Sequence, residues 1–251
     1  MPRLPRDAVD YIKNAQASYS KIIQHVQKQW NRHISKGLVN YYRGKKAGRT
    51  KTLSIERINQ HEWDWLVGLY YADGCKFIDR YNHTVAFSLS SLDVEIRNKL
   101  VSILDRIGLK ARVSSVRGEK AIDIRICNKN LYSALPDKES EYTPKSPLAF
   151  LAGLFDGDGH IKKHPCGEKW IFTQAKYPHL VQQVASIAQK YGKVSISLQQ
   201  RKDNKSKPVY RVSILREARK ALSRNEFAEY SVSCRLLKSG GQDFHEVKPS
   251  F

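Results

Sequence analysis

The order of hydrophobic and polar positions predicts the same series of elements twice between residues 60 and 225. Apolar residues at helical spacing predict helices, and strict alternation of polar and apolar residues predicts strands. After an apolar helix, the first series gives strands over 75–79 and 84–90, a helix over 92–107, strands over 110–117 and 120–127, and a short helix over 129–135. The second gives strands over 160–164 and 169–174, a helix over 178–191, strands over 193–201 and 208–215, and a short helix over 216–223. Self-similarity over a long period indicates two copies of one α/β unit.

The predicted strands have one apolar and one polar face. In residues 193–201, the apolar Val194, Ile196 and Leu198 alternate with Lys193, Ser195, Ser197, Gln199 and Arg201. The same alternation runs through 84–90 and 122–126. We therefore expect an α+β fold in which helices cover one face of each antiparallel sheet. Serine, glutamine, arginine and lysine on the open face can read base edges, although a solvated sheet face requires no partner.

A basic segment over residues 1–50 precedes the repeats. Apolar residues at helical spacing, with Ser35 as the cap of a second helix, predict two short helices there, with the buried positions Ile22, Ile23, Val26, Trp30, Leu38, Val39 and Tyr42. Lys36, Asn40 and Arg43 would face outward, so the pair resembles a helix-turn-helix whose second helix enters the major groove. The usual turn glycine is missing, and a helical brace packed on the main domain is an equal alternative.

These patterns divide the chain into five parts. The basic segment 1–50 is followed by a first repeat over 60–135, a proline-containing linker over 136–147, a second repeat over 148–225 and a C-terminal tail over 226–251.

The chain carries a large excess of positive charge. It has 44 Lys and Arg against 24 Asp and Glu, a formal net charge of +20, and residues 1–60 are the most basic part. Such an excess favours a polyanionic partner, because neutralising phosphates supplies affinity. A solubilising surface and an acidic membrane are the alternatives. No stretch approaches the roughly 18 apolar residues of a membrane span or resembles a signal peptide, so we expect no membrane partner.

We expect an intracellular location, in the cytoplasm or nucleoid of a prokaryote or in an organelle of a eukaryote. The four cysteines form no CxxC pair, which argues against structural zinc. We expect all four to be small buried side chains in a reducing compartment.

An acidic motif ends the first helix of each copy. Residues 66–74 read LVGLYYADG and residues 151–159 read LAGLFDGDG, both of the form L-x-G-L-x-x-x-D-G. The inner glycines allow two such helices to approach closely, and the final glycines permit the turn out of the helix. Asp73 and Asp158, 85 positions apart, would then lie side by side. Two carboxylates at helix C-termini repel each other and the helix dipoles, so we expect cations between them.

Magnesium is suited to this arrangement because it prefers a few carboxylates, phosphate oxygens and water. Two metal ions shared by the acids can activate a water and stabilise the leaving 3′ oxygen in phosphodiester cleavage. One aspartate per copy suits a duplex, in which each strand needs its own cut. We expect two or more Mg²⁺ ions, with Mn²⁺ as a substitute.

The duplicated motif resembles the LAGLIDADG motifs of homing endonucleases of the single-chain two-motif type. The resemblance covers roughly residues 60–225. It implies two αββαββα halves about a pseudo-two-fold axis, with saddle-shaped antiparallel sheets in the major groove. It also implies cleavage of a long asymmetric DNA target across the minor groove, by metal-dependent hydrolysis that leaves 3′ overhangs, as in intron homing.

The resemblance also implies roles for particular residues. The last acid of each motif binds metal, which carries over to Asp73 and Asp158, and we add Ala72 and Gly157 as metal ligands next to them. The preceding acid of the motif matches Asp156 but is Tyr71 in the first copy, so the halves need not be equivalent. A polar residue ending the second strand matches Gln174, with Ser91 as its weaker counterpart. Basic catalytic candidates are Arg125 and Arg216, with Arg211 as a rival to Arg216.

The candidate DNA contacts are basic and polar residues of the N-terminal segment and of the open sheet faces. They are Lys36, Asn40, Arg43, Lys45, Lys46, Arg49, Lys76, Arg80, Ser88, Ser90, Arg112, Arg117, Lys162, Lys193, Ser195, Ser197, Gln199, Arg201 and Arg211. Each of these residues is also open to the simpler interpretation of a solvated or phosphate-contacting side chain.

Two functions remain open at this point. A monomeric endonuclease acting on double-stranded DNA explains why both acids are retained. An intron RNA maturase or a non-catalytic DNA-binding regulator of the LAGLIDADG type is the alternative, and the N-terminal segment gives it some support. A pure binder has no reason to keep two repelling carboxylates together, whereas a maturase can keep them.

Overall fold

The computed structural model describes residues 4–46, 53–79, 82–115, 120–164, 167–199 and 208–234. The chain divides into two compact units, residues 1–52 and residues 53–251. Each unit has a hydrophobic core of its own. Among the described residues, no helix has the length and apolar character to cross a bilayer.

The larger unit repeats one series of helices and strands. Its first half runs α4 (Gln60–Asp73), β1 (Gly74–Asp79), β2 (Asn82–Ser90), α5 (Val94–Arg106), β3 (Arg112–Ser115), β4 (Ala121–Cys127) and α6 (Lys129–Ala134), after the short η1 (Ile55–Arg57). Its second half runs α7 (Pro147–Asp158), β5 (Gly159–His164), β6 (Gly167–Gln174), α8 (Pro178–Gln189), β7 (Val194–Gln199), β8 (Val209–Ile214) and α9 (Arg216–Arg224), and is followed by α10 (Phe227–Tyr230). The predicted αββαββα duplication is confirmed.

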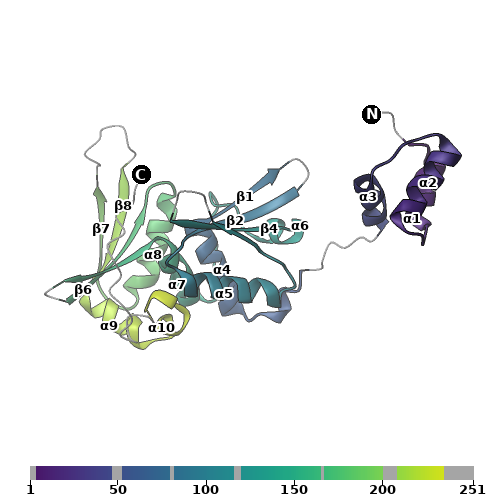
Figure 1. Ribbon diagram of the computed structural model, residues 1–251. Coiled ribbons are helices and arrows are strands. Elements are labelled where there is room, and N and C mark those ends of the chain that lie inside the picture. The colour runs from purple at the N-terminus through teal and green to yellow at the C-terminus, as the bar shows by residue number, and fades with distance from the viewer. Residues whose placement is uncertain are drawn as a thin grey trace. The chain divides into compact units, whose positions relative to one another are not determined.

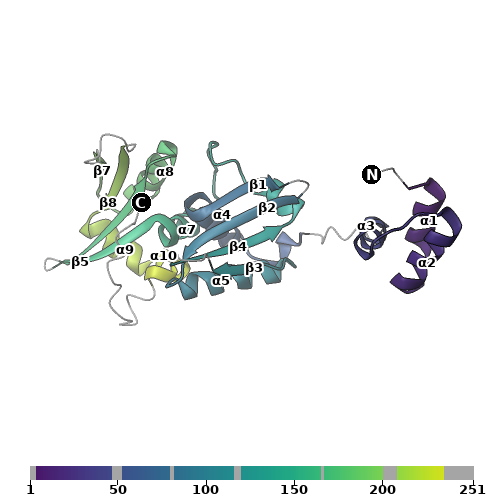
Figure 2. The ribbon, with the colours of Figure 1, turned by 45° about the horizontal axis from the view of Figure 1, so that its top comes forward.

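Each half builds one antiparallel four-stranded sheet, in the orders β1-β2-β4-β3 and β5-β6-β8-β7. Helices pack on one face of each sheet, while α4 and α7 lie side by side between the sheets (Figures 1 and 2). In the first sheet Val85, Phe87 and Leu89 are buried toward the helices, and Ser88 and Arg125 are exposed on the other face. The alternation in the sequence therefore identified the two faces correctly.

Two glycines determine how closely α4 and α7 pack. A Cβ on Gly68 would lie 2.2 Å from the Phe150 carbonyl oxygen, and a Cβ on Gly153 would lie 2.1 Å from the Trp65 carbonyl oxygen. Any larger residue would push the helices apart, because backbone atoms cannot move aside as side chains do. The close contact brings the C-terminal ends of the two helices together.

The glycines that follow the helices have a different purpose from the one we expected. Gly74 and Gly159 have extended backbone, with φ of −87° and −81°, which any residue can adopt. A Cβ on Gly159, however, would lie 2.1 Å from the Phe155 carbonyl oxygen, and one on Gly74 would lie 2.7 Å from the Tyr70 carbonyl oxygen. Steric crowding, rather than a left-handed turn, excludes side chains at these positions.

The linker over 136–147 is bound tightly along α4. The Tyr71 hydroxyl donates to the carbonyl oxygens of Asp137 (3.2 Å) and Ser140 (2.7 Å). At the other end of α4, the buried carboxylate of Asp64 accepts from the Tyr142 hydroxyl (2.5 Å) and from the Ser146 amide (2.6 Å), just before α7 begins. Tyr71, which replaces the acid of the motif, thus fixes the linker.

The matching acid of the second motif fixes a different segment. Asp156 is buried and accepts hydrogen bonds from the Trp65 indole (2.9 Å), the Ser231 hydroxyl (2.7 Å) and the amides of Val232 and Ser233 (3.0 and 3.1 Å). Asp156 therefore attaches the segment after α10 to α7. The position two residues before the last acid thus binds the linker in the first motif, through Tyr71, and the segment after α10 in the second motif, through Asp156.

The N-terminal unit contains three helices, α1 (Arg6–Asn14), α2 (Tyr19–Trp30) and α3 (Lys36–Lys46). The second and third correspond to the predicted pair, and the Ser35 hydroxyl accepts from the Leu38 amide at the start of α3 (3.2 Å). Helix α1 was not predicted. Its Ile12 joins Ile22, Ile34 and others in a separate small core.

The cysteines are less buried than we expected. Cys75 and Cys127 are exposed and Cys234 is buried, all three with free thiols, while Cys166 lies outside the described residues. Small size alone therefore did not predict their burial.

Candidate active site

Asp73 and Asp158 end α4 and α7, and the helix packing brings them to one place. A Cβ on Gly157 would lie 2.4 Å from the Ala72 Cβ and 2.9 Å from Asp73 Oδ2, so these residues are in direct contact. The two motif acids and the two residues before them thus meet at one seam, as the duplicated motif led us to expect.

The protein environment disfavours negative charge on both acids. Burial, followed by the charges of Asp158 and Asp93, raises the pKa of Asp73 to about 8. Burial also raises the pKa of Asp158 to about 6, although Lys138 and a hydrogen bond from Gln174 act in the opposite direction. Both side chains are half-buried. Partly desolvated carboxylates with raised pKa values are characteristic of sites that bind a cation or carry out proton chemistry.

Gln174 is the closest polar partner of Asp158. It lies at the end of β6, where its Nε2 donates to Asp158 Oδ2 (3.1 Å). Its Oε1 accepts from the amides of Ala175 and Lys176, at 3.0 Å each. The two backbone amides fix the orientation of the side chain, so the amide group presents a donor to the carboxylate.

The first half has no counterpart of this glutamine. Gly74 pairs with Phe87 and Gly159 pairs with Phe172, which fixes the correspondence between the two sheets. Two residues after each phenylalanine come Leu89 and Gln174. Ser91 was therefore the wrong counterpart, and a leucine that is 2% exposed occupies the equivalent position.

A lysine from the linker lies at the acid pair, and sequence reasoning missed it. Lys138 Nζ donates to the Tyr71 carbonyl oxygen (2.9 Å), in the last turn of α4. Its ammonium lies over the rings of Tyr70 (5.3 Å) and Tyr177 (5.7 Å). Burial lowers the pKa of Lys138 to about 8, and the charges of Asp158 and Asp73 partly oppose that shift.

The predicted basic catalytic residues lie in three different places. Arg125 is exposed on the open face of the first sheet, where it pairs with Asp123 (2.8 Å). Arg211 lies on β8 beside Tyr210, which pairs with Gln174, and faces Thr173 on the open side of the second sheet. Its Nε is buried without a hydrogen-bond partner among the described residues.

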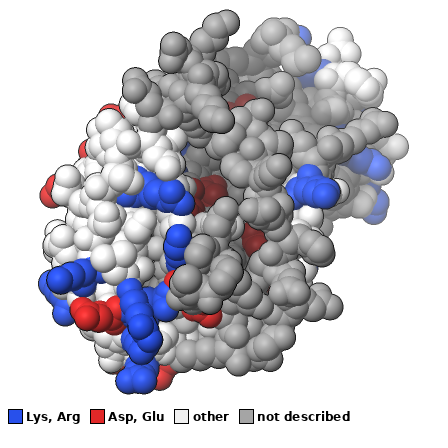
Figure 3. Space-filling model, turned by 90° about the vertical axis from the view of Figure 1, so that its left-hand side faces the viewer, with Lys and Arg blue, Asp and Glu red and all other residues white. Residues whose placement is uncertain are grey.

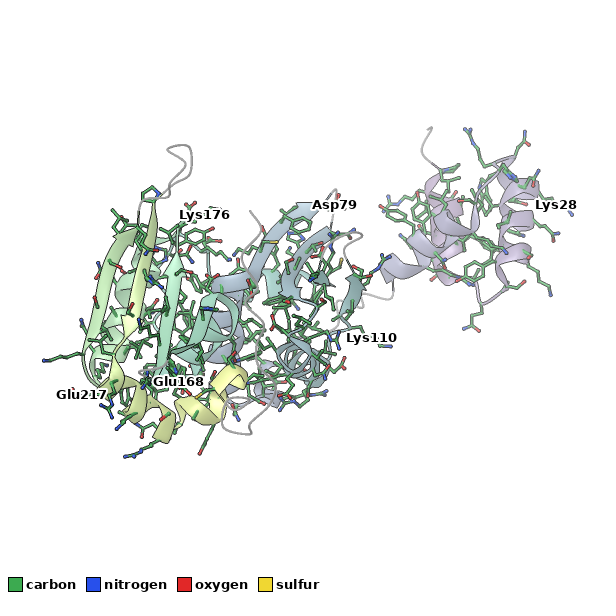
Figure 4. All side chains as sticks on the ribbon, turned by 60° about the vertical axis from the view of Figure 1, so that its left-hand side comes forward. Lys28, Asp79, Lys110, Glu168, Lys176 and Glu217 are labelled. Atoms are coloured by element: carbon green, nitrogen blue, oxygen red, sulfur yellow. The ribbon has the colours of Figure 1, made fainter. Side chains whose placement is uncertain are left out.

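Arg216 is not brought to the acids. It begins α9, after Ile214, and Ile214 pairs with Trp170 rather than with Gln174. Figure 4 shows its neighbour Glu217 and Glu168 at the end of the second sheet opposite Lys176, which follows Gln174 closely. Arg211 is therefore the better placed of the two rivals.

Most of the described open-face candidates are available to a ligand. The exposed ones are Ser88, Arg112, Lys193, Ser195, Ser197 and Gln199, and Ser90 is half-buried. Figure 3 shows basic side chains interspersed with acidic ones on the side of the larger unit that carries the second half. Lys76 is an exception, because its ammonium pairs with Asp137 (2.6 Å) and donates to the Leu135 carbonyl oxygen (2.9 Å) on the helix-covered face. Lys76 holds the linker and does not face a groove.

In the N-terminal unit, two of the three predicted outward residues, the half-buried Arg43 and the exposed Asn40, bind groups of the same unit. Arg43 donates to the carbonyl oxygens of Ala15 and Ala17 (2.7 Å to the latter), which fixes the connection between α1 and α2. Asn40 accepts from the Tyr19 hydroxyl (2.5 Å). Only Lys36 of the three is exposed without such a contact in the described part of the unit. The prediction of Arg43 as a DNA contact was wrong about the direction of its side chain.

The remaining predicted DNA contacts cannot be placed. Arg49, Arg80, Arg117 and Arg201 lie outside the described residues, and Lys45, Lys46 and Lys162 are described only by their backbone.

The donors at the seam fit a magnesium-type ion. Within the described ranges, no group of three or more His, Cys, Asp or Glu side chains is arranged to hold a metal. Mg²⁺ retains several waters and takes one or two carboxylates together with substrate phosphates, so two carboxylates suffice. Asp73, Asp158 and the carbonyl groups of Ala72 and Gly157 are the residues that would hold it.

Comparisons with known proteins agree with this geometry. Residues 145–243 match the family described as LAGLIDADG-like domain. I-DmoI in complex with DNA and Ca superposes with a TM-score of 0.52 at 16% identity, covering 72% of this chain and 98% of that one. Mesophilic variants from the homing endonuclease I-DmoI give the same TM-score and coverage at 15% identity.

Two further proteins show weaker similarity. The N-terminal LAGLIDADG domain of DUF199/WhiA has a TM-score of 0.45 at 11% identity, covering 78% of this chain and 90% of that domain. The uncharacterised protein MJ0398 of Methanocaldococcus jannaschii is 23% identical over 165 residues, which is 62% of this chain. The match spans 61% of the length of that relative. The chain thus contains a LAGLIDADG-like domain, and its larger unit has the two-halved LAGLIDADG fold.

Proposed function

We propose that this protein is a site-specific endonuclease that cuts both strands of DNA by metal-dependent phosphodiester hydrolysis. One observation carries the proposal: the half-buried, mutually repelling carboxylates of Asp73 and Asp158 meet where the two halves join. A solely structural pair would cost stability with no compensating gain. Magnesium ions held there would activate the attacking water and stabilise the developing charge.

The surrounding residues hold the DNA and orient the site. Exposed serine, glutamine and arginine side chains on the two open sheet faces contact bases and phosphates. Gln174 fixes the carboxylate of Asp158. Water attacks the phosphorus, the P–O3′ bond breaks, and solvent supplies the proton to the 3′ oxygen and removes one from the attacking water.

Selection of cleaved sites from a random DNA library in the presence of Mg²⁺ tests the proposal and supplies a target. On that target, Asp73→Asn and Asp158→Asn should retain binding and lose cutting of at least one strand. Asp79→Asn is the matched control, because this exposed acid on β1 lies away from the seam and should leave cutting intact. Cutting of both strands by the two seam variants would contradict the proposal.

Non-catalytic DNA binding is the second candidate. The unequal halves favour it, because Leu89 stands where the second half has Gln174. If the protein binds a defined DNA sequence in the selection but never cuts it in Mg²⁺ or Mn²⁺, a non-catalytic DNA-binding regulator would be supported. Tight binding to a structured intron RNA in the same conditions would support the maturase.

A further inference from the structure

The linker between the two halves contributes a positive charge to the acid pair. We propose that Lys138 is the basic residue of the catalytic site and contacts the phosphate that is cut between Asp73 and Asp158. This inference rests on the proposed endonuclease function and adds a residue to its site. Neither motif contains Lys138, which comes from a segment that joins the repeats and belongs to neither of them.

The contacts of Lys138 fix its ammonium near both acids. Nζ donates to the Tyr71 carbonyl oxygen (2.9 Å), two residues before Asp73. The rings of Tyr70 and Tyr177 flank the ammonium at 5.3 and 5.7 Å, and these rings limit how much of the ammonium contacts solvent. The charges of Asp158 and Asp73 both act on it. A half-buried cation next to two carboxylates, held by a carbonyl and two rings, is in place before any substrate arrives.

The neighbouring contacts explain why the linker can hold this lysine rigidly. On one side, Lys76 pairs with Asp137 (2.6 Å) and donates to the Leu135 carbonyl oxygen. On the other side, the Tyr71 hydroxyl donates to the Ser140 carbonyl oxygen (2.7 Å). Tyr71 therefore contacts the linker through its hydroxyl and Lys138 through its carbonyl. The second motif has Asp156 at the matching position, which binds the segment after α10 instead.

The other cations considered are less suitable for this role. Arg125 is exposed and already paired with Asp123. Arg216 lies toward the opposite end of the second sheet. Lys176 is exposed, its ammonium lies over the other side-chain ring that Lys138 contacts, Tyr177 (5.0 Å), and no charge of a motif acid is among the causes that shift its pKa. The charges of both motif acids act on Lys138.

The role is electrostatic. Attack on the phosphorus places additional negative charge on the non-bridging oxygens, and a preorganised ammonium in a partly desolvated site stabilises that charge. Lys138 exchanges no proton in this step. The attacking water forms the new P–O bond, the P–O3′ bond breaks, and the protons pass to and from solvent as described above.

Cutting of the selected plasmid by Lys138→Met and Lys138→Arg, in the full chain, tests the inference. Lys138→Met should cut about a hundredfold more slowly, with affinity for the same DNA in Ca²⁺ within about threefold of the unsubstituted protein. Lys138→Arg should recover part of the rate. Lys138→Ala should regain activity when methylamine is added, which a merely structural lysine would not do. Lys110→Met is the matched control and should leave the rate of cutting unchanged, because this exposed lysine precedes β3, at the edge of the first sheet.

Binding of Mn²⁺ without DNA, followed by electron paramagnetic resonance, gives a readout independent of cutting. Removing a positive charge from the acid pair should tighten Mn²⁺ binding severalfold in Lys138→Met and leave it unchanged in Lys110→Met. Unchanged cutting in Lys138→Met, or no methylamine rescue in Lys138→Ala, would overturn the inference. If the unsubstituted protein cuts no DNA, the proposed function fails, and equal Mn²⁺ affinity in Lys138→Met and the unsubstituted protein would then overturn the placement of Lys138 as well.

Discussion

Gln174 and Leu89 occupy the same register position in the two sheets, yet one is an amide bonded to Asp158 and the other is a buried leucine. This difference affects the pKa values of the two acids. A donated hydrogen bond favours the charged carboxylate, and the pKa of Asp158 is raised less than that of Asp73, to about 6 against about 8. The two halves share a fold but present unequal acids to the substrate.

Removing the donor of Gln174 should therefore make Asp158 harder to ionise. In Gln174→Glu the two backbone amides keep an acceptor oxygen, but the donor to Asp158 becomes a second negative charge. We expect the pKa of Asp158 to rise, the pH profile of cutting to move to higher pH, and the rate at neutral pH to fall at least about tenfold. Gln174→Leu should act in the same direction.

Thr173→Val serves as the control, because Thr173 is exposed on the opposite face of β6. The measurement is the rate of cutting as a function of pH, with the carboxyl resonance of Asp158 followed by carbon NMR in the metal-free protein. An unchanged pH profile in both Gln174 variants would show that the hydrogen bond does not govern the acid.

The raised pKa of Asp73 also predicts how metal-free stability depends on pH. The unfolded carboxyl titrates near its model value of 3.8, and the folded one near 8. Between these values the folded state holds a proton that the unfolded state has lost, so this group lowers the free energy of unfolding as pH rises from about 4 to about 8. Above pH 8 the lowered pKa of Lys138 acts in the opposite direction.

Asp73→Asn should abolish this contribution. In denaturant titrations with EDTA, the variant should gain stability over the unsubstituted protein as pH rises from about 5 to about 8, by on the order of a few kcal/mol. Added Mg²⁺ should reduce the difference, because it stabilises the two charged acids. A difference that stays constant across this pH range would contradict the raised pKa.

The close packing of α4 on α7 predicts a large effect of a single methyl group. Gly68→Ala places a Cβ against the Phe150 carbonyl oxygen and the Leu154 amide. The helices must separate, which should destabilise the larger unit by about 3 kcal/mol. Denaturant unfolding monitored by tryptophan fluorescence measures the change.

Gly44→Ala, in α3, is the opposite case. Among the described residues, apart from its chain neighbours and the backbone of α3 itself, no atom lies within 4 Å of the Cβ that this change would add. Because alanine favours helix over glycine, the N-terminal unit should gain about 0.5–1 kcal/mol. A loss of stability in Gly44→Ala as large as that in Gly68→Ala would show that the steric argument is wrong.

The fold and the acid pair could be predicted because the patterns that produce them occur twice in the sequence. The alternation around Val85 and Phe87 identifies the buried face of a strand, and two copies of one motif bring Asp73 and Asp158 to one seam. Register was less predictable, since a comparison by eye placed Ser91 where backbone pairing places Leu89. An error of two residues keeps the side chain on the same face, so the periodic pattern does not reveal it.

The charged residues whose contacts the sequence did not predict have one feature in common. Lys76, Arg43 and Lys138 are long, flexible side chains whose directions depend on partners distant in sequence, namely Leu135, Ala17 and Tyr71. No periodic pattern encodes such pairs. Each of them binds a backbone carbonyl, which every residue carries, so the amino-acid sequence contains no sign of the acceptor.

The N-terminal unit should add affinity for DNA without adding catalysis. It has a core of its own, and residues 1–60 carry 13 of the 44 basic residues against 3 of the 24 acidic ones. Deleting residues 1–52 should weaken binding to the selected target and make it less dependent on salt, because fewer counterions are released. The logarithmic salt slope should become shallower by about 0.9 for each DNA phosphate that the truncated protein no longer neutralises.

The rate of cutting and two point variants show whether the N-terminal unit contributes to DNA binding alone or also to catalysis. The single-turnover rate of cutting at saturating truncated protein should stay within about threefold, since the acid pair lies in the larger unit. Lys36→Ala should reproduce part of the shallower slope with the unit still folded. Arg43→Ala should instead loosen the connection between α1 and α2, seen as a decrease in helical circular dichroism. If the truncated protein keeps the affinity and salt slope of the full chain, the N-terminal unit does not bind this DNA.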